Sequence, residues 1–463
     1  MVSLKTQFNR QKQAFNNNPM PGIRERKHRL EQLALLIKEN KQAIVQAISD
    51  DFGHRSEFET LSAEVMTTLM AINNSQKKIK HWLKTRYILA PLFLQPISSK
   101  IIYQPLGVVG IMVPWNYPLN LALNPLVDAL AAGNNIMIKM SEFSPKLGFL
   151  LESLLPQYIA PEIATIINGE VEVSMEFSKL NFDLLFFTGS IPVGKMIQKT
   201  ASENLTPVVL ELGGKSPALI DGSFNIKTTA ERLVWAKTYN SGQTCVAPDY
   251  VLVQKDYLEK LRAAIINEYN NRFPDFATNK DVTNIINIKQ FNRLVSYLNE
   301  VEHAGQNIDY CQTRKDNSGK LPLTLLSGNI CSLRIMKEEI FGPLLPLIAV
   351  DNMQEAIRFI NERPRPLAAY AYSSNKTLHR TLETETHSGA LVINDAVIHF
   401  TIENIPIGGI GNSGMGHYHG HDGFLTFSNA KPVIKRGKIN PARLAYAPYD
   451  RFFHKLFLKL LLK

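Results

Sequence analysis

Apolar residues recur at two different spacings along the chain, and these spacings predict where helices and strands lie. In residues 23–50, leucine and isoleucine recur at helical intervals with charged residues between them, which predicts a helix packed on a larger body. Residues 84–107 have a different pattern, because three prolines interrupt β-favouring side chains. We expect this segment to leave the first domain as a hairpin-like excursion.

Short apolar runs then alternate with amphipathic segments in two series. The first series predicts a helix ending at Gly133 and strands at 107–115, 135–140, 164–168 and 182–189. The second begins near residue 214 and predicts strands at 217–220, 344–350, 367–373 and 390–395. Apolar strands that alternate with helices are typical of a parallel, doubly wound sheet. The expected fold is α/β, with two doubly wound domains and a small protruding β element.

The amino-acid composition predicts the class of protein and the compartment in which it works. With 463 residues, 45% hydrophobic and 20% charged, the chain has the make-up of a soluble globular protein with a large core. Three cysteines are too few, and odd in number, for a disulfide framework, and their spacing suggests no zinc site. The first residues lack the apolar segment of a signal peptide, so we expect a cytoplasmic protein with reduced thiols.

Most of the net charge of +10 belongs to the end of the chain. Residues 431–463 hold nine Lys and Arg against one acid, a net +8, which leaves +2 for the preceding 430 residues. A nearly neutral body argues against a nucleic-acid partner.

The last residues, 451–463, predict a basic amphipathic helix. Lys455, Lys459 and Lys463 are four apart and therefore stack on one helix face. The rest of the surface is apolar and comprises Phe452, Phe453, Leu456, Phe457, Leu460 and Leu461. At ~1.5 Å per residue this helix is too short to span a ~30 Å hydrocarbon core. Two interpretations remain: peripheral attachment to an anionic membrane on its inner face, or docking on the protein itself or a partner subunit.

Two residues are candidates for covalent chemistry. Cys245 lies in the polar stretch TYNSGQTCVAPDY, where a reactive thiolate needs a partly accessible site. Cys311 and Cys331 have no such neighbours and are expected to be small buried residues. Glu211, in LELGGKSP, follows an apolar run, and burial there would raise its pKa toward the range of a general base. Alternatively, Glu211 is a structural carboxylate hydrogen-bonded to loop amides.

Other polar residues follow the predicted strands. Asn116 comes after the first strand and has a side-chain N–H that suits a developing oxyanion, although a turn asparagine is an alternative. Lys139 and Glu142 follow the second strand, where an acid can bind ribose hydroxyls or form a solvated pair. Gly189 and Gly194 flank a strand-to-helix turn that suits a phosphate, but the usual G-x-G-x-x-G pattern is absent.

Seven segments together resemble the signature segments of aldehyde dehydrogenases, in the same order. They are PWNYP, IKMSE, FFTGSIPVG, LELGGKSP, GQTCVAPDY, EEIFGPLLPL and IPIGGIGNSGMGHYHGHDGF. The resemblance extends to about residue 430 and is greatest to the class-three branch, which includes coniferyl-aldehyde and fatty-aldehyde enzymes. It implies that Cys245 is the nucleophile, that Asn116 and the Cys245 N–H hold the oxyanion, and that Glu211 activates the hydrolytic water.

The same resemblance assigns the cofactor residues. Lys139 and Glu142 match positions that contact the adenosine ribose, and Ser190, between Gly189 and Gly194, matches one near the pyrophosphate. Glu339 and Phe341 match positions that hold the nicotinamide ribose and ring. NAD is expected over NADP, which stays possible, because Glu142 would repel a 2′-phosphate.

A metal is not expected at the histidine-rich loop. His417, His419 and His421 occupy alternate positions there, but no cysteine or acid cluster joins them.

The resemblance also implies domains, partners and substrate. Residues 1–83 and 106–213 would bind NAD(P), 214–395 would form the catalytic domain, 84–105 with 396–430 would bridge two subunits, and 431–463 would be the tail. The implied protein is a homodimer that oxidises an aromatic or apolar aldehyde, of coniferyl type, through a cysteine thiohemiacetal and thioester. The alternatives are a long-chain fatty-aldehyde enzyme and a catalytically silent binding or structural protein.

Overall fold

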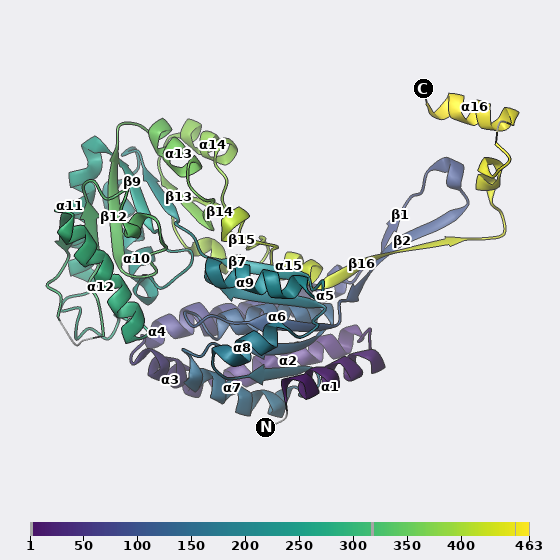
Figure 1. The fold of residues 1–463 in the computed structure, drawn as a ribbon, viewed down its shortest axis with the longest axis horizontal. Coiled ribbons are helices and arrows are strands. Elements are labelled where there is room, and N and C mark those ends of the chain that lie inside the picture. The colour runs from purple at the N-terminus through teal and green to yellow at the C-terminus, as the bar shows by residue number, and fades with distance from the viewer. Residues whose placement is uncertain (1–2, 316–318, 450, 463) are drawn as a thin grey trace.

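A computed structural model describes residues 3–315, 319–449 and 451–462. Two lobes are packed against each other, and a long arm leaves them and ends at the C-terminal helix (Figure 1). Each lobe is built around its own sheet, and a third sheet forms the arm. The expected α/β fold with two doubly wound domains and a β element is therefore confirmed.

The first lobe contains a six-stranded sheet in the order β15-β7-β6-β3-β4-β5. Its strands are β3 Val108–Met112, β4 Asn135–Lys139, β5 Ala164–Ile167, β6 Leu184–Gly189, β7 Val208–Leu212 and β15 Gly414–Met415. All neighbours are parallel except β15, which runs antiparallel to β7. The four strands predicted from the first apolar series are present.

Helices cover both faces of this sheet. They are α1 Leu4–Asn17, α2 Ile23–Glu39, α3 Lys41–Phe52, α4 Glu57–Thr60, α5 Thr67–Trp82, α6 Asn120–Ala132, α7 Pro145–Tyr158, α8 Val171–Ser178, α9 Ile191–Ser202 and α15 Gly420–Thr426. Alternate strand residues point to opposite faces, so Val109 and Ile111 pack under α2, α5, α6 and α7. Val108 and Met112 instead pack toward α1, α8 and α9. This two-sided burial explains why the strands are apolar throughout.

Two predicted helices can be compared with the observed ones at their boundaries. Residues 23–50 form two helices rather than one, because the chain breaks at Asn40 between α2 and α3. The Asn40 side chain donates a hydrogen bond to the Leu36 carbonyl, a local bond that competes with the helix ladder. Gly133 ends α6 as expected, with a φ of 95°, a left-handed conformation that favours glycine.

The second lobe contains a seven-stranded sheet in the order β10-β11-β12-β9-β8-β13-β14. Its strands are β8 Pro217–Ile220, β9 Tyr250–Gln254, β10 Asn307–Tyr310, β11 Thr324–Ser327, β12 Leu344–Val350, β13 Ala368–Tyr372 and β14 Ala390–Ile393. Only β10 runs antiparallel to its neighbour. The four predicted strands are found, whereas β9, β10 and β11 were missed.

Asparagine side chains start four helices of this lobe. The lobe's helices are α10 Ile226–Thr238, α11 Leu258–Arg272, α12 Ile288–His303, α13 Met353–Asn361 and α14 Lys376–Glu385. The capping residues, each accepting a hydrogen bond from a first-turn N–H, are Asn225, Asn287, Asn352 and Asn375.

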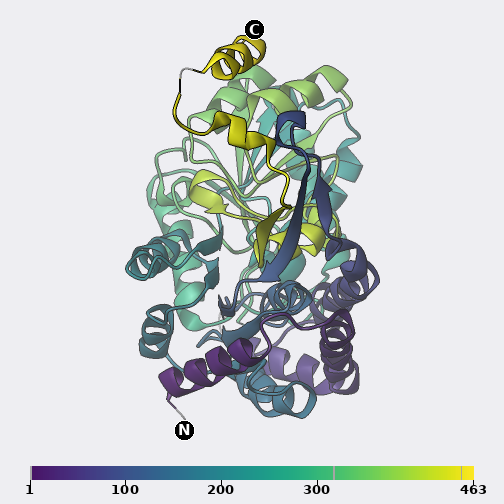
Figure 2. The same ribbon diagram turned by 90° about the vertical axis from the view of Figure 1, so that its right-hand side faces the viewer.

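The arm is an antiparallel sheet in the order β1-β2-β16, with β1 Arg86–Ile88, β2 Ile97–Pro105 and β16 Ser428–Arg436. It confirms the expected excursion, and β16 continues past residue 430, where the tail was expected to begin. Beyond β16 lie a short turn, Pro441–Ala445, and α16 Phe452–Leu461 (Figure 2). Lys463 and the side chains of Leu460 and Leu461 lie outside what is described.

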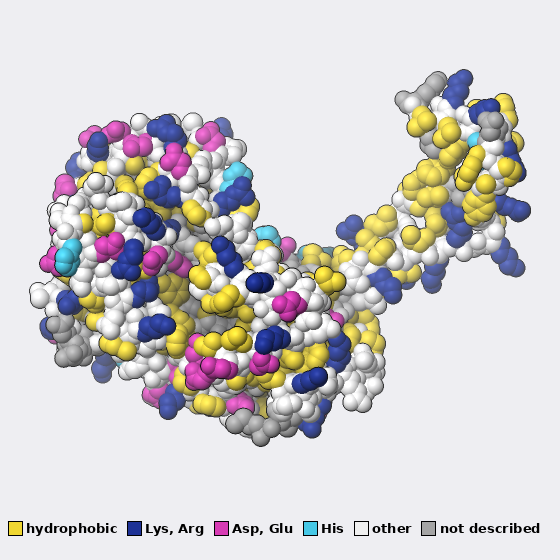
Figure 3. All heavy atoms as spheres, viewed as in Figure 1, with side chains coloured by type: hydrophobic (Ala, Val, Ile, Leu, Met, Phe, Trp, Pro, Cys, Tyr) yellow, Lys and Arg dark blue, Asp and Glu magenta, His cyan; other side chains and the backbone are white. Residues whose placement is uncertain are grey.

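The arm exposes many apolar side chains, and Lys and Arg lie along its border (Figure 3). The exposed apolar residues include Tyr87, Leu89, Leu92, Ile434, Ile439, Tyr449, Phe452, Phe453 and Leu458. Phe457 of α16 packs against Phe93 of the arm, with ring centroids 5.7 Å apart. Within the described residues, no helix has the length and apolarity needed to cross a membrane.

Candidate active site

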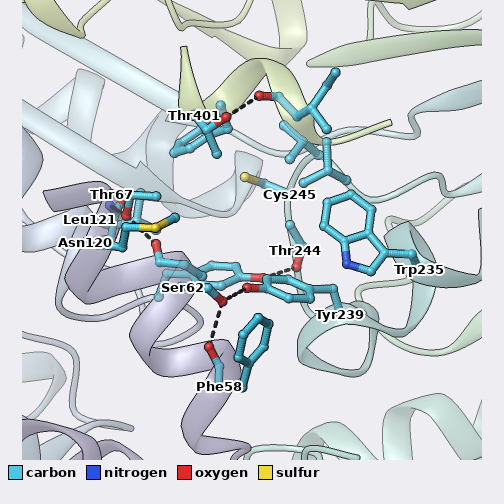
Figure 4. Close-up of a pocket in the computed structure, with 17 residues that line it drawn as sticks. Phe58, Ser62, Thr67, Asn120, Leu121, Trp235, Tyr239, Thr244, Cys245 and Thr401 are labelled. Atoms are coloured by element: carbon cyan, nitrogen blue, oxygen red, sulfur yellow. Dashed lines mark hydrogen bonds between the residues drawn. The ribbon is translucent and has the colours of Figure 1, made fainter. Parts of the chain in front are cut away.

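Cys245 lies where two cavities meet. An apolar cavity of about 370 Å³ (Figure 4) and a second cavity of about 610 Å³, called the polar cavity because its walls carry more polar and charged residues, are both lined by this residue. Cys245 follows a short helical turn, Tyr239–Gly242, in which Asn240 and Ser241 have φ values of 51° and 52°. The thiol can therefore be reached by one molecule from each side.

Hydrogen bonds fix the backbone of the cysteine loop. The Gln243 side chain donates to the carbonyls of Asn240 and Asn284, at 3.0 Å each, and accepts from the Ile286 N–H. On the other side of Cys245, the Tyr370 hydroxyl donates to the Val246 carbonyl. The thiol is thus held at a defined position.

The surroundings of Cys245 keep its thiol protonated. Burial raises the pKa of the Cys245 thiol, and the carboxyl groups of Glu211 and then Glu339 raise it further. A thiol in this state needs a neighbouring base before it can attack. The nucleophile therefore depends on the carboxyl groups around it.

Glu211 is the most isolated carboxyl group of the site. It lies on β7 opposite Gly414 and is buried, and its Oε1 has no hydrogen-bond partner among the described residues. Burial raises its pKa to about 8, the range of a general base near neutral pH. The hydrogen bonds to loop amides expected of a structural carboxylate are not made at Oε1.

Asn116 joins its own loop to the loop of Cys245. Its side chain donates to the Gln243 carbonyl at 3.1 Å, and its backbone carbonyl accepts from Asn240 Nδ2 at 2.9 Å. Asn116 lines the polar cavity together with Cys245 and Glu211. The amide therefore faces the same space as the thiol and the carboxyl group.

A buried ion pair that the sequence analysis missed supports this arrangement. Arg55 and Glu64 are 2.6 Å apart, and neither side chain has any exposed surface. Arg55 also donates to the Asn116 carbonyl, while Glu64 accepts from the backbone N–H groups of Leu119 and Asn120. No local motif marks the contact between Arg55 and Asn116, because 61 positions separate them.

The polar cavity carries most of the expected cofactor residues. Gly189, Ser190, Glu339 and Phe341 line it, beside the start of α9. First-turn N–H groups of a helix have no partner within the helix and suit an anionic group. Burial raises the pKa of Glu339 to about 8, and its carboxyl group accepts a hydrogen bond from the Gly214 N–H. The cavity thus offers both phosphate-type and hydroxyl-type contacts.

Three expected cofactor residues are not among those lining this cavity. A Cβ at Gly194 would lie 2.6 Å from the Leu212 side chain, so this glycine lets α9 pack on β7. Lys139 ends β4, and its Nζ donates to the carbonyls of Met140 and Gly169 at 2.7 Å each. Burial lowers the pKa of Lys139, and the half-buried Glu142 opposes that effect. Lys139 and Glu142 lie at the carboxyl end of β4, the strand next to β3.

The histidine loop lacks a metal-like arrangement. The His419 ring is buried without hydrogen-bond partners, and burial lowers its pKa to about 3. His421 stacks on Phe424, with ring planes 10° apart, and His417 is exposed. In the parts of the chain that are described, no three metal-ligating side chains cluster.

The other two cysteines differ from each other. Cys311 is buried in the core of the second lobe, as expected, and burial raises its pKa to about 12. The expectation was wrong for Cys331, which is exposed because it follows β11 in a surface loop.

The chain is similar to known proteins over most of its length. The model of the aldehyde dehydrogenase family matches residues 5–433. A probable coniferyl aldehyde dehydrogenase of Pseudomonas aeruginosa is 45% identical over 99% of this chain and 96% of its own. A dimeric NADP-preferring aldehyde dehydrogenase of Rattus norvegicus is 36% identical over 95% and 96%. The substrate-bound structure of AldH from Staphylococcus aureus has a TM-score of 0.95 and 35% identity, covering 100% of both chains.

Replacing Arg55 by Met should destabilise the protein by about 3–5 kcal/mol, because it leaves the Glu64 carboxyl group buried without its cation. The matched control is Arg334→Met, whose exposed pair with Glu300 should contribute little to stability because water and salt screen it. Denaturant unfolding followed by tryptophan fluorescence measures both. Equal losses in the two variants would show that the buried pair is not a structural support.

Proposed function

This chain belongs to the aldehyde dehydrogenase family, and we propose that it oxidises aromatic or apolar aldehydes to carboxylic acids with NAD(P) through covalent catalysis by Cys245. The observation that carries the proposal is the position of Cys245 on the border of two cavities. An aldehyde in the apolar cavity and a dinucleotide in the polar cavity would meet at the thiol.

The first step forms a thiohemiacetal. Sγ of Cys245 attacks the aldehyde carbon, and the thiol proton passes to Glu211, whose charge acts on Cys245 more strongly than that of Glu339. The carbonyl oxygen gains negative charge and receives hydrogen bonds from the Asn116 amide and the Cys245 N–H. Rigid loops suit this role, since preorganised donors need little movement during the reaction.

The second half of the reaction releases the acid. A bound nicotinamide, held by Glu339 and Phe341, would supply the hydride acceptor, and loss of hydride from the former aldehyde carbon would leave a thioester on Cys245. Glu211 releases the thiol proton to solvent and then takes a proton from the water molecule that attacks the thioester carbon. This second proton passes to the departing Cys245 sulfur, which restores the thiol as the acid leaves. The sum is aldehyde, water and NAD⁺ converted to acid, NADH and a proton.

The residues of the polar cavity fit a dinucleotide. Ser190 at the start of α9 would lie near the pyrophosphate, and Glu339 and Phe341 would hold the nicotinamide ribose and ring. Trp115 contacts Phe341 edge to face at 5.3 Å, which supports the ring position. We keep NAD as the preferred form because Glu142 is an acid, although the Rattus norvegicus relative prefers NADP by its name.

The apolar cavity supports an aromatic or otherwise apolar substrate. Aromatic side chains on its walls include Phe58, Tyr117, Trp235, Tyr239 and Phe400. A flat ring can stack against such walls, and a relative with 45% identity is named for coniferyl aldehyde. A long-chain fatty aldehyde is the second candidate, because the same walls are also favourable for an alkyl chain.

The direct test is NADH formation from a panel of aldehydes. Coniferyl aldehyde, a long-chain fatty aldehyde and a short aliphatic aldehyde are each mixed with the enzyme and NAD, and then with NADP. The coniferyl substrate with NAD should give the highest kcat/KM. Absence of turnover with every aldehyde would favour a catalytically silent binding protein.

Cys245→Ser should lower turnover by roughly 10³-fold or more, since a neutral hydroxyl is a far weaker nucleophile. Fluorescence titration should give nearly unchanged NAD binding. Cys331→Ser is the control and should keep its turnover, because this thiol is exposed and lies outside the apolar cavity. Similar losses in both folded variants would refute the assignment of the nucleophile.

Glu211→Gln should slow steady-state turnover about 10²–10⁴-fold, because the amide cannot take a proton from water. The burst of NADH should slow less than turnover, because Glu339 also acts on Cys245 and remains to take the thiol proton. Wild-type turnover should rise as the pH passes through 8, since the carboxylate form of Glu211 increases as the pH passes its pKa of about 8. Rapid mixing at several pH values measures both effects. A burst slowed as much as turnover would mean that another group is the hydrolytic base.

The arm supports two further parts of the proposal, a homodimer and contact with a membrane. Its exposed apolar side chains form a surface of the kind that marks interaction sites, and a second copy could cover the β1-β2-β16 face. At the tip, α16 combines exposed aromatic residues with basic ones, which suits the interface of an anionic bilayer. This membrane contact would be peripheral, on the cytoplasmic side.

Deleting residues 451–463 separates these two roles. Full-length protein should sediment with anionic vesicles at low salt and the deletion variant should not, because the cationic and apolar helix is lost. Light scattering should give twice the chain mass for both proteins. Conversion of the deletion variant to a monomer, without vesicle binding by the full-length protein, would mean that the tail docks on the partner subunit.

A further inference from the structure

One wall of the apolar cavity carries a pair of hydroxyl groups away from Cys245. Ser62 lies in a π-helical turn, Leu61–Met66, between α4 and α5, and Tyr239 begins the short turn that leads to Cys245. Ser62 Oγ and the Tyr239 hydroxyl are 2.6 Å apart, and both residues line the cavity. In Figure 4, Thr244 lies between Cys245 and Tyr239, so the pair is set back from the thiol.

The hydroxyl protons of this pair determine which residue donates the hydrogen bond and which accepts it. Ser62 Oγ is 2.6 Å from the Phe58 carbonyl oxygen, which can only accept a hydrogen bond. The single hydroxyl proton of Ser62 is therefore donated to that carbonyl, and the Tyr239 hydroxyl must donate its own proton to Ser62. The Tyr239 oxygen keeps its lone pairs, but has no proton left for a third group.

The second hydroxyl pair of the cavity keeps one proton that is free to be donated to another group. The Tyr117 hydroxyl and Thr244 Oγ1 are 2.8 Å apart, and either can donate to the other. No carbonyl takes a proton from this pair among the described residues, so one of its two protons stays available to a third group. The cavity thus has a donor near Cys245, at Thr244 or Tyr117, and an acceptor at Tyr239.

Apart from Ser62, the side chains near Tyr239 in the cavity are largely apolar. The Trp235 ring lies 5.5 Å from the Tyr239 ring at an angle of 47°, and Phe58 and Met66 also line the cavity. A polar atom in this setting adds little affinity for an alkyl chain. It does discriminate between substrates that bring a hydrogen-bond donor and those that bring none.

Resting on the proposed function, we propose that Tyr239 accepts a hydrogen bond from a hydroxyl group at the ring end of an aromatic aldehyde, opposite the carbonyl. Ser62 is the positioning residue. It accepts the hydrogen bond that the Tyr239 hydroxyl donates, so the Tyr239 oxygen can only accept a hydrogen bond from the substrate. The pair selects phenolic aldehydes over their methyl ethers, which can only accept hydrogen bonds.

Three aldehydes with the same skeleton test this selection: cinnamaldehyde and its 4-hydroxy and 4-methoxy derivatives. At a pH where the phenol is protonated, kcat/KM of the wild type should be roughly 3–10-fold higher for the hydroxy than for the methoxy compound. Tyr239→Phe should bring this ratio close to one. The ratio cancels any general effect of the substitution on turnover.

Ser62→Ala gives the sharper result. Without Ser62, the Tyr239 proton is released and can be donated to the methoxy oxygen, so the methoxy compound should gain several-fold relative to cinnamaldehyde. Tyr310→Phe, on β10 and outside the cavity, is the control and should leave all ratios unchanged.

The outcomes separate this inference from the proposed function. If the wild type oxidises none of the aldehydes, the proposed function itself fails. If it oxidises all three but Tyr239→Phe leaves the hydroxy-to-methoxy ratio unchanged, the proposed function stands and the role of Tyr239 is wrong. A Ser62→Ala variant with the wild-type ratios would likewise overturn the role of Ser62. Tyr239→Phe alone decides the case if Ser62→Ala does not fold.

Discussion

The guanidinium of Arg55, which has no exposed surface, connects the segments from which the site is built. It pairs with Glu64, donates to the Asn116 carbonyl and lies 4.8 Å from the centre of the Tyr117 ring. Glu64 in turn holds the start of α6, and Asn240 of the second lobe binds the same Asn116 carbonyl. A buried charge tolerates little displacement of its partners, since any loss of contact leaves it uncompensated. The relative position of Asn116 and the cysteine loop therefore follows from this one cation.

Burial also decides the protonation of the reacting groups. The thiol of Cys245 and the carboxyl group of Glu211 both have raised pKa values because they are buried, and the charge of Glu211 makes the thiolate form of Cys245 still less favourable. Two such groups exchange a proton more easily than either ionises alone in a site of low polarity. Glu211 is suited to act in both halves of the reaction because its Oε1 is not engaged elsewhere.

The two cavities have separate roles in the proposed function: the polar cavity would hold the cofactor, and the apolar cavity would hold the substrate. The polar cavity is formed at the carboxyl ends of β3, β6 and β7, where a doubly wound sheet offers loops and a helix start. The apolar cavity is formed instead by α4, the turn Leu61–Met66, the starts of α5 and α6, α10, the cysteine loop and residues 397–401. Changes in the walls of the apolar cavity can thus alter the substrate without disturbing the cofactor side. The π-helical turn that carries Ser62 is one such wall.

The sequence by itself determined most of the strands and led to the proposed reacting groups. Apolar runs fixed eight of the strands, Gly133 fixed a helix end, and the motifs around Glu211 and Cys245 indicated a base and a nucleophile, because these features depend on local pattern. It did not predict β9, the break at Asn40 or the exposure of Cys331, which depend on packing and local competition for hydrogen bonds. Only the tertiary structure brought Arg55 to Asn116 and Ser62 to Tyr239, residues 61 and 177 positions apart. Contacts across such separations leave no periodic signal, since they arise when the lobes fold and pack together.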